Sequence, residues 1–221
     1  MSFNGFPEEF VDFLFSLQLN NTIALLPQNK IKYKELITEP LTHLYNDLVP
    51  VVSSISDSII VRPSKCISSM YSDMRFSRET PLKGYMYLRF REPFSDKDIL
   101  GFYFDMGCEH YSCGIRIYKQ TSSGMEKIRQ SVLVNRESFA HELDQLSRLD
   151  MKIYGDSFTK DRYTDINDDM IKGFLNKKSF YIGCNRDISS TVYCNELAVE
   201  ISDAFRALGG LYSLIKNSLY R

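Results

Sequence analysis

The chain has 221 residues, of which 43% are hydrophobic and 25% charged, and its formal net charge is −1, a composition that argues against intrinsic disorder. Its five cysteines are odd in number and irregularly spaced, which argues against a disulfide framework and predicts reduced thiols in a cytoplasmic protein. No segment reaches the roughly 20 apolar residues of a membrane-spanning helix, and acidic residues near the N-terminus argue against a signal peptide, so we expect no membrane partner.

The first 50 residues are predicted to be helical. Pro7 is followed by two glutamates, which is typical of a first helical turn, and apolar residues then recur at helical spacing as far as Leu19. A second helical stretch covers residues 29–48, within which Pro40 marks either a kink or the first turn of a new helix. We expect Pro50 to end this stretch.

The middle of the chain is rich in β-forming residues. The predicted strands are residues 65–70, 85–91, 101–105 and 111–118. In the second of them Tyr85, Tyr87, Arg89 and Arg91 share one face, while the three residues between them are apolar and share the other. This alternation predicts a strand with one buried face and one basic, aromatic face in solvent. The short connections favour antiparallel pairing.

The C-terminal half combines helices with two more short strands. The helical segments are residues 125–132, 139–146, 168–175 and 196–208, and a last one that follows two glycines and reaches Tyr220. The strands are residues 151–155 and 179–184. The pattern predicts one α+β domain over residues 1–221, with an antiparallel central sheet of about five strands flanked by N- and C-terminal helices.

Motifs that anchor common cofactors are missing from the sequence. There is no GxxxxGK[ST], GxGxxG, HExxH or GxSxG, so we expect no cofactor. Cys108, His110 and Cys113 form the one cluster that resembles metal ligands, but a structural zinc site needs four ligands, usually from two well-spaced pairs. The same spacing fits a hairpin turn. The predicted site therefore contains no metal ligand, and metal binding by these three residues stays an open alternative.

One segment is basic within a chain of slightly negative charge. Residues 62–91 contain seven basic and two acidic residues, a net charge of +5. If Asp73 and Arg75 lie on a strand, their spacing places them on one face, where the carboxylate orients the guanidinium toward a phosphate or carboxylate. We therefore predict an anion-binding site at Asp73, Arg75, Lys83, Arg89 and Arg91. The alternative is a solvated sheet face covered with ion pairs.

Several motifs follow one another along almost the whole chain. They are Asn20-Asn21, Asn29-Lys30, Tyr33, Glu39-Pro40, Asp73-Met74-Arg75-Phe76-Ser77, Thr80-Pro81, Lys83, Gly114, Tyr118 and Ile128-Arg129. In their order and spacing, the chain resembles a bacterial family classed as domain of unknown function 2461, whose central motif is close to RxxRDxRFSxDKxPYK.

The chain departs from this family at several positions. Leu25-Leu26 stands where the family has Trp-Phe, and Ser69 and Ser72 stand at the two leading arginines of the central motif. Glu79 alone replaces Asp-Lys, and Leu82 replaces the tyrosine that follows the proline. The resemblance identifies a divergent member and implies no activity, ligand or cofactor.

Three functions follow from these residues. The first is a binding domain for an anionic ligand, which is a phosphorylated metabolite, a nucleotide or a nucleic acid strand. The second is an enzyme, a hydrolase or transferase acting on a phosphorylated or carboxylated substrate, with Asp73 as base or metal ligand and Arg75 as charge stabiliser. The third is a structural domain, or one that binds a protein partner, in which the charges form an interface.

Overall fold

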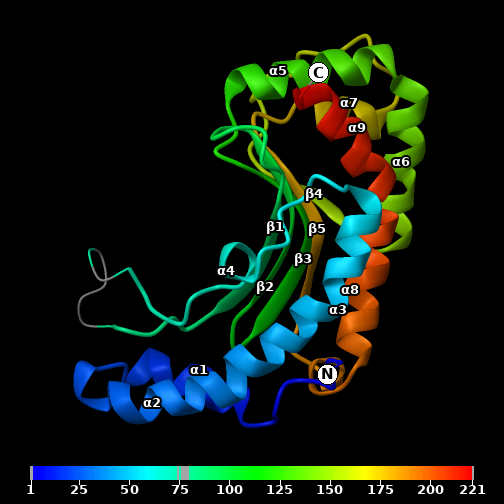
Figure 1. Ribbon diagram of the computed structural model, residues 1–221. Helices are drawn as coiled ribbons and strands as arrows, with labels where there is room; N and C mark the ends of the chain where they lie inside the picture. The colour runs from blue at the N-terminus through cyan, green and yellow to red at the C-terminus, as the bar shows by residue number, and fades with distance from the viewer. Residues whose placement is uncertain (1, 74, 76–79, 221) are drawn as a thin grey trace.

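The computed structural model describes residues 2–73, 75 and 80–220, apart from the side chains of residues 147 and 148. Its centre is a curved antiparallel sheet with the strand order β1-β2-β3-β5-β4 (Figure 1). The strands are β1 (Met86–Arg91), β2 (Ile99–Met106), β3 (His110–Tyr118), β4 (Lys152–Tyr154) and β5 (Tyr181–Asp187). The chain is therefore an α+β protein with one five-stranded sheet, which confirms the predicted fold class.

Helices cover one face of the sheet. They are α3 (Glu39–Ile55), α8 (Glu196–Ala207) and α9 (Gly209–Tyr220). Alternate residues of β1 point toward them, and Met86, Leu88 and Phe90 have no exposed surface. On the next strand the ring of Phe102 stacks on that of Tyr212 with 4.5 Å between centroids. Burial of these apolar side chains is the main source of the stability of the fold.

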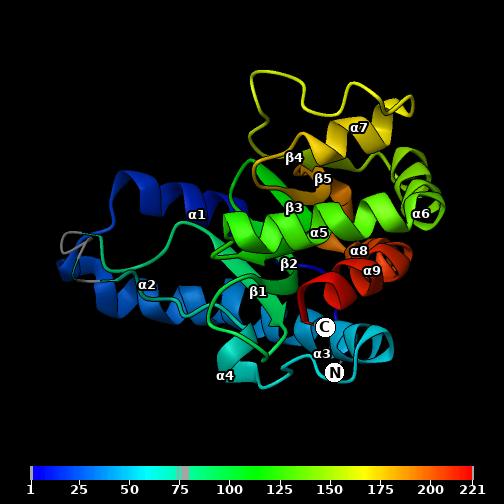
Figure 2. The same ribbon diagram turned by 90° about the horizontal axis from the view of Figure 1, so that it is seen from above.

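Most of the other helices lie at the two ends of the sheet (Figures 1 and 2). At one end are α1 (Phe10–Leu19), α2 (Leu26–Tyr33) and a π-helical segment (Lys34–Thr38) that leads into α3. At the other end are α5 (Ser122–Val134), α6 (Arg136–Arg148) and α7 (Asp169–Leu175). The face of the sheet that the helices leave uncovered lies between these two ends. None of the helices in the described part of the chain is long and apolar enough to cross a membrane.

Two details of the predicted secondary structure are wrong. Pro50 does not end a helix, because α3 continues to Ile55 and buries Val51 and Val52 against the core, which offsets the backbone hydrogen bond that proline cannot donate. Residues 65–70 are not a regular strand. Pro63 begins the short helix α4 (Pro63–Cys66), since its fixed φ suits a first helical turn, and only an isolated bridge at Ile67 follows.

Candidate functional site

The uncovered face of the sheet gathers polar and aromatic side chains from several strands. Alternation along β1 directs Tyr87, Arg89 and Arg91 away from the helices. The register places Asp105 of β2 opposite Tyr87, and Tyr103 opposite Arg89. We call this surface the open face. Its members are Tyr87, Arg89, Arg91, Tyr103, Asp105, Arg116, Tyr118, Tyr154 and Tyr181.

Pairing extends this face across the other strands. Arg116 of β3 lies opposite Gly101 of β2 on one side and Tyr181 of β5 on the other, and Tyr181 pairs with Tyr154 of β4. At Gly183 a Cβ atom would lie 2.5 Å from the hydroxyl oxygen of Tyr103, so the glycine leaves room for that side chain. The register thus brings together residues that are far apart in the sequence.

Guanidinium groups and tyrosine rings alternate along the open face. The Arg89 guanidinium lies 3.8 Å from the ring centroid of Tyr87 and 5.3 Å from that of Tyr118. The Arg116 guanidinium lies 6.0 Å from Tyr118 and 5.2 Å from Tyr181, whose ring stacks on Tyr154 at 4.8 Å. We call these six residues the Arg-Tyr ladder. Contact with the rings orients the guanidinium planes without using their N–H donors.

Three polar atoms of the open face are buried without a hydrogen-bond partner. They are Arg89 Nε, Asp105 Oδ1 and Tyr118 OH, and they complete the set of such side-chain atoms in the described part of the chain. A buried polar group left unsatisfied costs about 1–3 kcal/mol, so native proteins keep few of them. All three atoms lie on the same face of the sheet, on the neighbouring strands β1, β2 and β3.

Electrostatics on the open face follow from burial and from the arginines. Burial raises the pKa of Asp105, and the charges of Arg89 and Arg116 lower it by a smaller amount. Burial also raises the pKa of Tyr118 to about 12, against the opposing effect of Arg89. The Tyr118 hydroxyl therefore stays protonated at neutral pH and has a proton to donate.

The five residues predicted for the site lie in two places. Arg89 and Arg91 belong to the open face, and the Lys83 ammonium lies 5.1 Å from the ring centroid of Tyr87. Asp73 and Arg75 lie on no strand, and Figure 1 shows the segment that carries them reaching away from the sheet. The prediction that they share one face of a strand is therefore wrong, because there is no strand at these two residues.

Asp73 and Arg75 form a bidentate ion pair, although not on a strand face as predicted. Arg75 donates from Nε to Asp73 Oδ1 at 2.9 Å and from Nη2 to Oδ2 at 2.6 Å. These hydrogen bonds lower the pKa of Asp73, although both side chains are exposed. The motif residues Met74, Phe76, Ser77 and Glu79 lie outside the described residues. The Arg75 guanidinium is thus held by Asp73 on a loop, apart from the arginines of the sheet.

Arg116, Tyr118, Asp105 and Tyr181 were missed from the sequence. A signal for the first two exists in β3, where Ser112, Arg116 and Tyr118 alternate with apolar residues as the members of β1 do. Asp105 alternates with the phenylalanines at positions 102 and 104 of β2, which gives a similar local signal. Cross-strand register is what makes these residues one site.

The structure separates Cys108, His110 and Cys113. His110 lies on the open side of β3 and its Nδ1 is 2.8 Å from an oxygen of Asp187. Cys113 points to the covered side, with its Sγ 3.4 Å from that of Cys184. Among the described residues, no group of three or more His, Cys, Asp or Glu side chains is placed to hold a metal ion.

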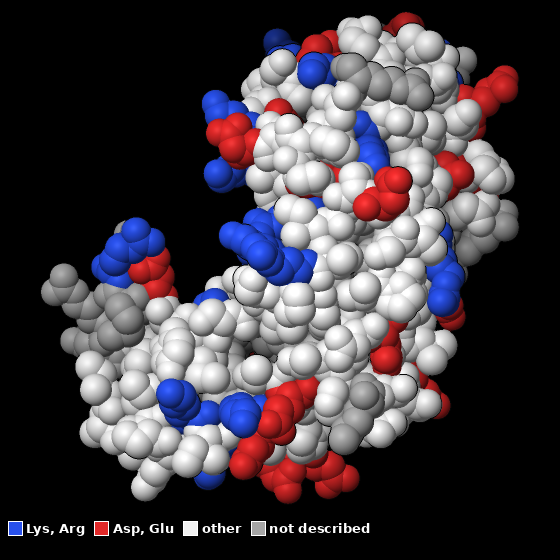
Figure 3. Space-filling model, in the orientation of Figure 1, with Lys and Arg blue, Asp and Glu red and all other residues white. Residues whose placement is uncertain are grey.

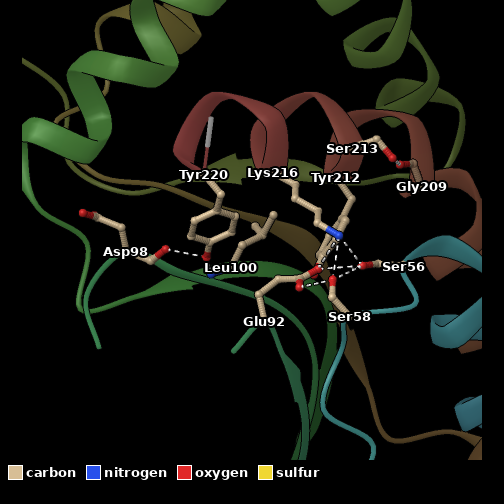
Figure 4. A network of polar contacts seen from close by, with 10 residues as sticks. All are labelled: Ser56, Ser58, Glu92, Asp98, Leu100, Gly209, Tyr212, Ser213, Lys216 and Tyr220. Atoms are coloured by element: carbon tan, nitrogen blue, oxygen red, sulfur yellow. Dashed lines mark hydrogen bonds and ion pairs between the residues drawn. The ribbon is translucent and has the colours of Figure 1, made fainter. Parts of the chain in front are cut away.

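A second polar cluster lies on the opposite side of the sheet, around the buried Glu92 (Figure 4). Ser56 and Tyr212 donate to Glu92 Oε1 at 2.7 and 2.9 Å, and Ser58 donates to Oε2 at 2.6 Å. The Lys216 ammonium lies 3.4 Å from Oε1 and donates to both serine hydroxyls at 2.7 Å. We call these five residues the Glu92 cluster.

The Glu92 cluster has the composition of a serine nucleophile beside a lysine base, but not its chemistry. The Lys216 ammonium donates to both serine hydroxyls and pairs with the carboxylate, whereas a general base accepts a hydrogen bond from the nucleophile. Both serine hydroxyls already donate to that carboxylate. The cluster joins α9 to the end of β1 and to the segment after α3.

Comparison with known proteins gives one finding. A family model described as "Conserved hypothetical protein (DUF2461)" matches residues 9–213 of the chain. The search of curated proteins found no match to the chain.

Proposed function

The chain thus belongs to the DUF2461 family of conserved hypothetical proteins, a description that states no activity, and we propose from the geometry that it is a binding domain for an anionic, phosphorylated ligand. The ligand binds on the open face, where Arg89, Arg91 and Arg116 lie on neighbouring strands. The observation that carries this proposal is the set of three buried, unpartnered polar atoms on that face. Two of them, Arg89 Nε and Tyr118 OH, are donors suited to phosphate oxygens.

The shape and charge of the surface support the same ligand class. Figure 3 shows a group of Lys and Arg side chains inside the hollowed side of the molecule, where the open face lies in Figure 1. A concave surface lined by one sign of charge concentrates the electric field and attracts ions of opposite sign. A ligand with several negative charges therefore gains more at this face than a neutral one.

The two alternative functions have less support. An enzyme that uses Asp73 as its base is disfavoured, because the ion pair with Arg75 lowers the pKa of that exposed carboxyl. A protein partner would use arginine and tyrosine as well, but the uncovered face of the sheet also contains the buried carboxylate of Asp105 between two arginines, and such charged residues are depleted at the core of protein interfaces. The polar character of this face favours a charged ligand.

Thermal denaturation in the presence of inorganic tripolyphosphate tests the proposal. A ligand at 100 times its Kd stabilises the folded state by about 2.7 kcal/mol, which raises the Tm of a domain of this size by roughly 5–10 °C. We expect this shift in the wild-type protein, and we expect Arg89→Met and Arg116→Met to lose most of it. Arg206→Met removes an exposed arginine of α8 and serves as the matched control. Equal shifts in all three variants would place binding elsewhere.

A further inference from the structure

The ligand of the open face should contact the tyrosines of the Arg-Tyr ladder as well as its arginines. We infer that it is a single-stranded nucleic acid, whose bases stack on the tyrosine rings while the arginines hold its phosphates. This inference rests on the proposed function, since it assigns the identity of the anion to the same site. Stacking on aromatic side chains combined with cationic groups along a backbone path is how proteins bind single strands.

The first argument is the number and spacing of the rings. Tyr87, Tyr118, Tyr154 and Tyr181 lie on four strands, and all four are half-buried rather than covered. Neighbouring strands lie about 4.8 Å apart, so the path from β1 to β4 across the sheet is roughly 19 Å long. A free nucleotide has one base and needs one ring. A row of four rings matches a strand of several nucleotides.

The second argument is a basic and aromatic hollow beyond the ladder. Phe158 follows Tyr154 by four residues, and its ring has the Arg162 guanidinium at 3.5 Å and the Lys178 ammonium at 5.8 Å. Together with Thr159 and Lys160 these residues line a hollow of about 440 Å³. The hollow thus combines an aromatic ring with cations, as the ladder does, and begins four residues after the last tyrosine of the ladder.

The Phe158 ring is held in place from the protein side. The buried Arg129 donates to the carbonyls of Leu175 and Lys177 at 3.0 and 2.5 Å, and its guanidinium lies 5.2 Å from that ring. The Phe158 ring is therefore in a fixed position, where a base of the nucleic acid can stack on it. The cationic side chains that line the same hollow are Lys160, Arg162 and Lys178.

Asp105 sets a preference among bases. A carboxylate repels phosphate, but it accepts hydrogen bonds from the amino groups on base edges, such as the N4 amino group of cytosine. Asp105 Oδ1 has no partner within the protein, and Arg89 and Arg116 lie beside this carboxylate. A single strand leaves both hydrogens of this amino group free, whereas a duplex leaves only the one at the edge of the major groove.

Fluorescence anisotropy with labelled single strands tests this inference. The probes are an oligonucleotide of mixed sequence, an abasic strand of equal length and charge, a nucleoside triphosphate and tripolyphosphate. We expect the oligonucleotide to bind at least about tenfold more tightly than the abasic strand, since each stacked base contributes on that scale. Tyr181→Leu should remove most of this preference, and Tyr193→Leu, which changes a tyrosine packed against Phe10, should retain it. Both variants are first checked for a cooperative thermal transition.

The other outcomes separate the two proposals. Equal affinity for the oligonucleotide and the abasic strand, or binding of the nucleoside triphosphate alone, would overturn the single-strand inference and leave the anion-binding proposal in place. If no probe binds, tripolyphosphate included, both are wrong. Loss of the base preference in Tyr193→Leu as well would show that the ladder is not the stacking surface.

Discussion

Each side of the sheet has a carboxylate beside cationic groups, and the two carboxylates differ in their hydrogen bonding. On the covered side, Glu92 accepts three hydrogen bonds from hydroxyl groups and pairs with Lys216. On the open face, Asp105 lies near Arg89 and Arg116, yet its Oδ1 has no hydrogen bond. A buried carboxylate with every oxygen satisfied strengthens the fold, whereas one left incomplete weakens it.

This difference gives a physical criterion for separating polar clusters that complete the fold from those that can take a ligand. Both clusters contain the residue types of active sites, so composition does not distinguish them. What distinguishes them is the completeness of their hydrogen bonding. Proteins retain destabilising polar groups where binding needs them, because selection acts on function above a threshold of stability.

Glu92→Gln is expected to have the largest effect on stability. A small effect would contradict the contrast drawn between the two sides of the sheet. The change leaves the Lys216 ammonium without its carboxylate, and breaking a buried ion pair costs about 3–5 kcal/mol. Because the Lys216 side chain is 24% exposed, we expect the lower end, about 3 kcal/mol, which corresponds to a Tm lower by roughly 6–12 °C. Thermal and urea denaturation measure it. Asp203→Asn, in an exposed pair with Arg206, should change stability by less than about 1 kcal/mol.

Tyr212→Phe sharpens the comparison by removing a single hydrogen bond of the Glu92 cluster. The phenylalanine keeps the ring that stacks on Phe102 and loses only the hydroxyl that donates to Glu92. A hydrogen bond to a charged group contributes about 1.5–3 kcal/mol, so we expect a loss in that range from urea denaturation. A loss below about 0.5 kcal/mol would mean that the serines satisfy Glu92 without it.

The two regions also differ in how far the sequence predicts them. Alternation along β1 is a local pattern, so it correctly assigned Arg89 and Arg91 to a solvent-facing side of a strand. The contact of Arg89 with Tyr118 depends on the register of β1, β2 and β3, which local patterns do not encode.

The Glu92 cluster was beyond prediction for the same reason. Ser56 and Glu92 are 36 residues apart, and Ser56 and Lys216 are 160 apart. Asp73 and Arg75 show the opposite case, since a spacing of two residues suggested a strand face where the chain forms a loop. Spacing predicts a shared face only where the backbone is extended.

Asp105→Asn is expected to stabilise the protein at neutral pH. Because burial raises the pKa of Asp105 in the folded state, the folded protein binds this proton more tightly than the unfolded chain does. Stability from this group is therefore greatest below the ordinary aspartate pKa of about 3.9 and falls as pH rises through the raised value. The variant should have a higher Tm than wild type at pH 7, with the difference shrinking as pH approaches 4. A lower Tm at pH 7 would show that the two arginines need this carboxylate.

Tyr118→Phe has the smallest expected effect on stability. It tests most directly whether an unpartnered buried hydroxyl serves a ligand or the fold. The variant removes a buried hydroxyl that makes no hydrogen bond to the described residues, so its free energy of unfolding should equal that of wild type or exceed it by up to about 1 kcal/mol, the lower end for an unsatisfied group, because the side chain is only half-buried. Tyr212→Phe, the same chemical change in the Glu92 cluster, is its matched control. If Tyr118→Phe keeps stability but reduces the Tm shift produced by tripolyphosphate, the hydroxyl serves the ligand. If it instead destabilises the protein as much as Tyr212→Phe does, Tyr118 is part of the architecture, and the distinction between the two sides of the sheet fails at this residue.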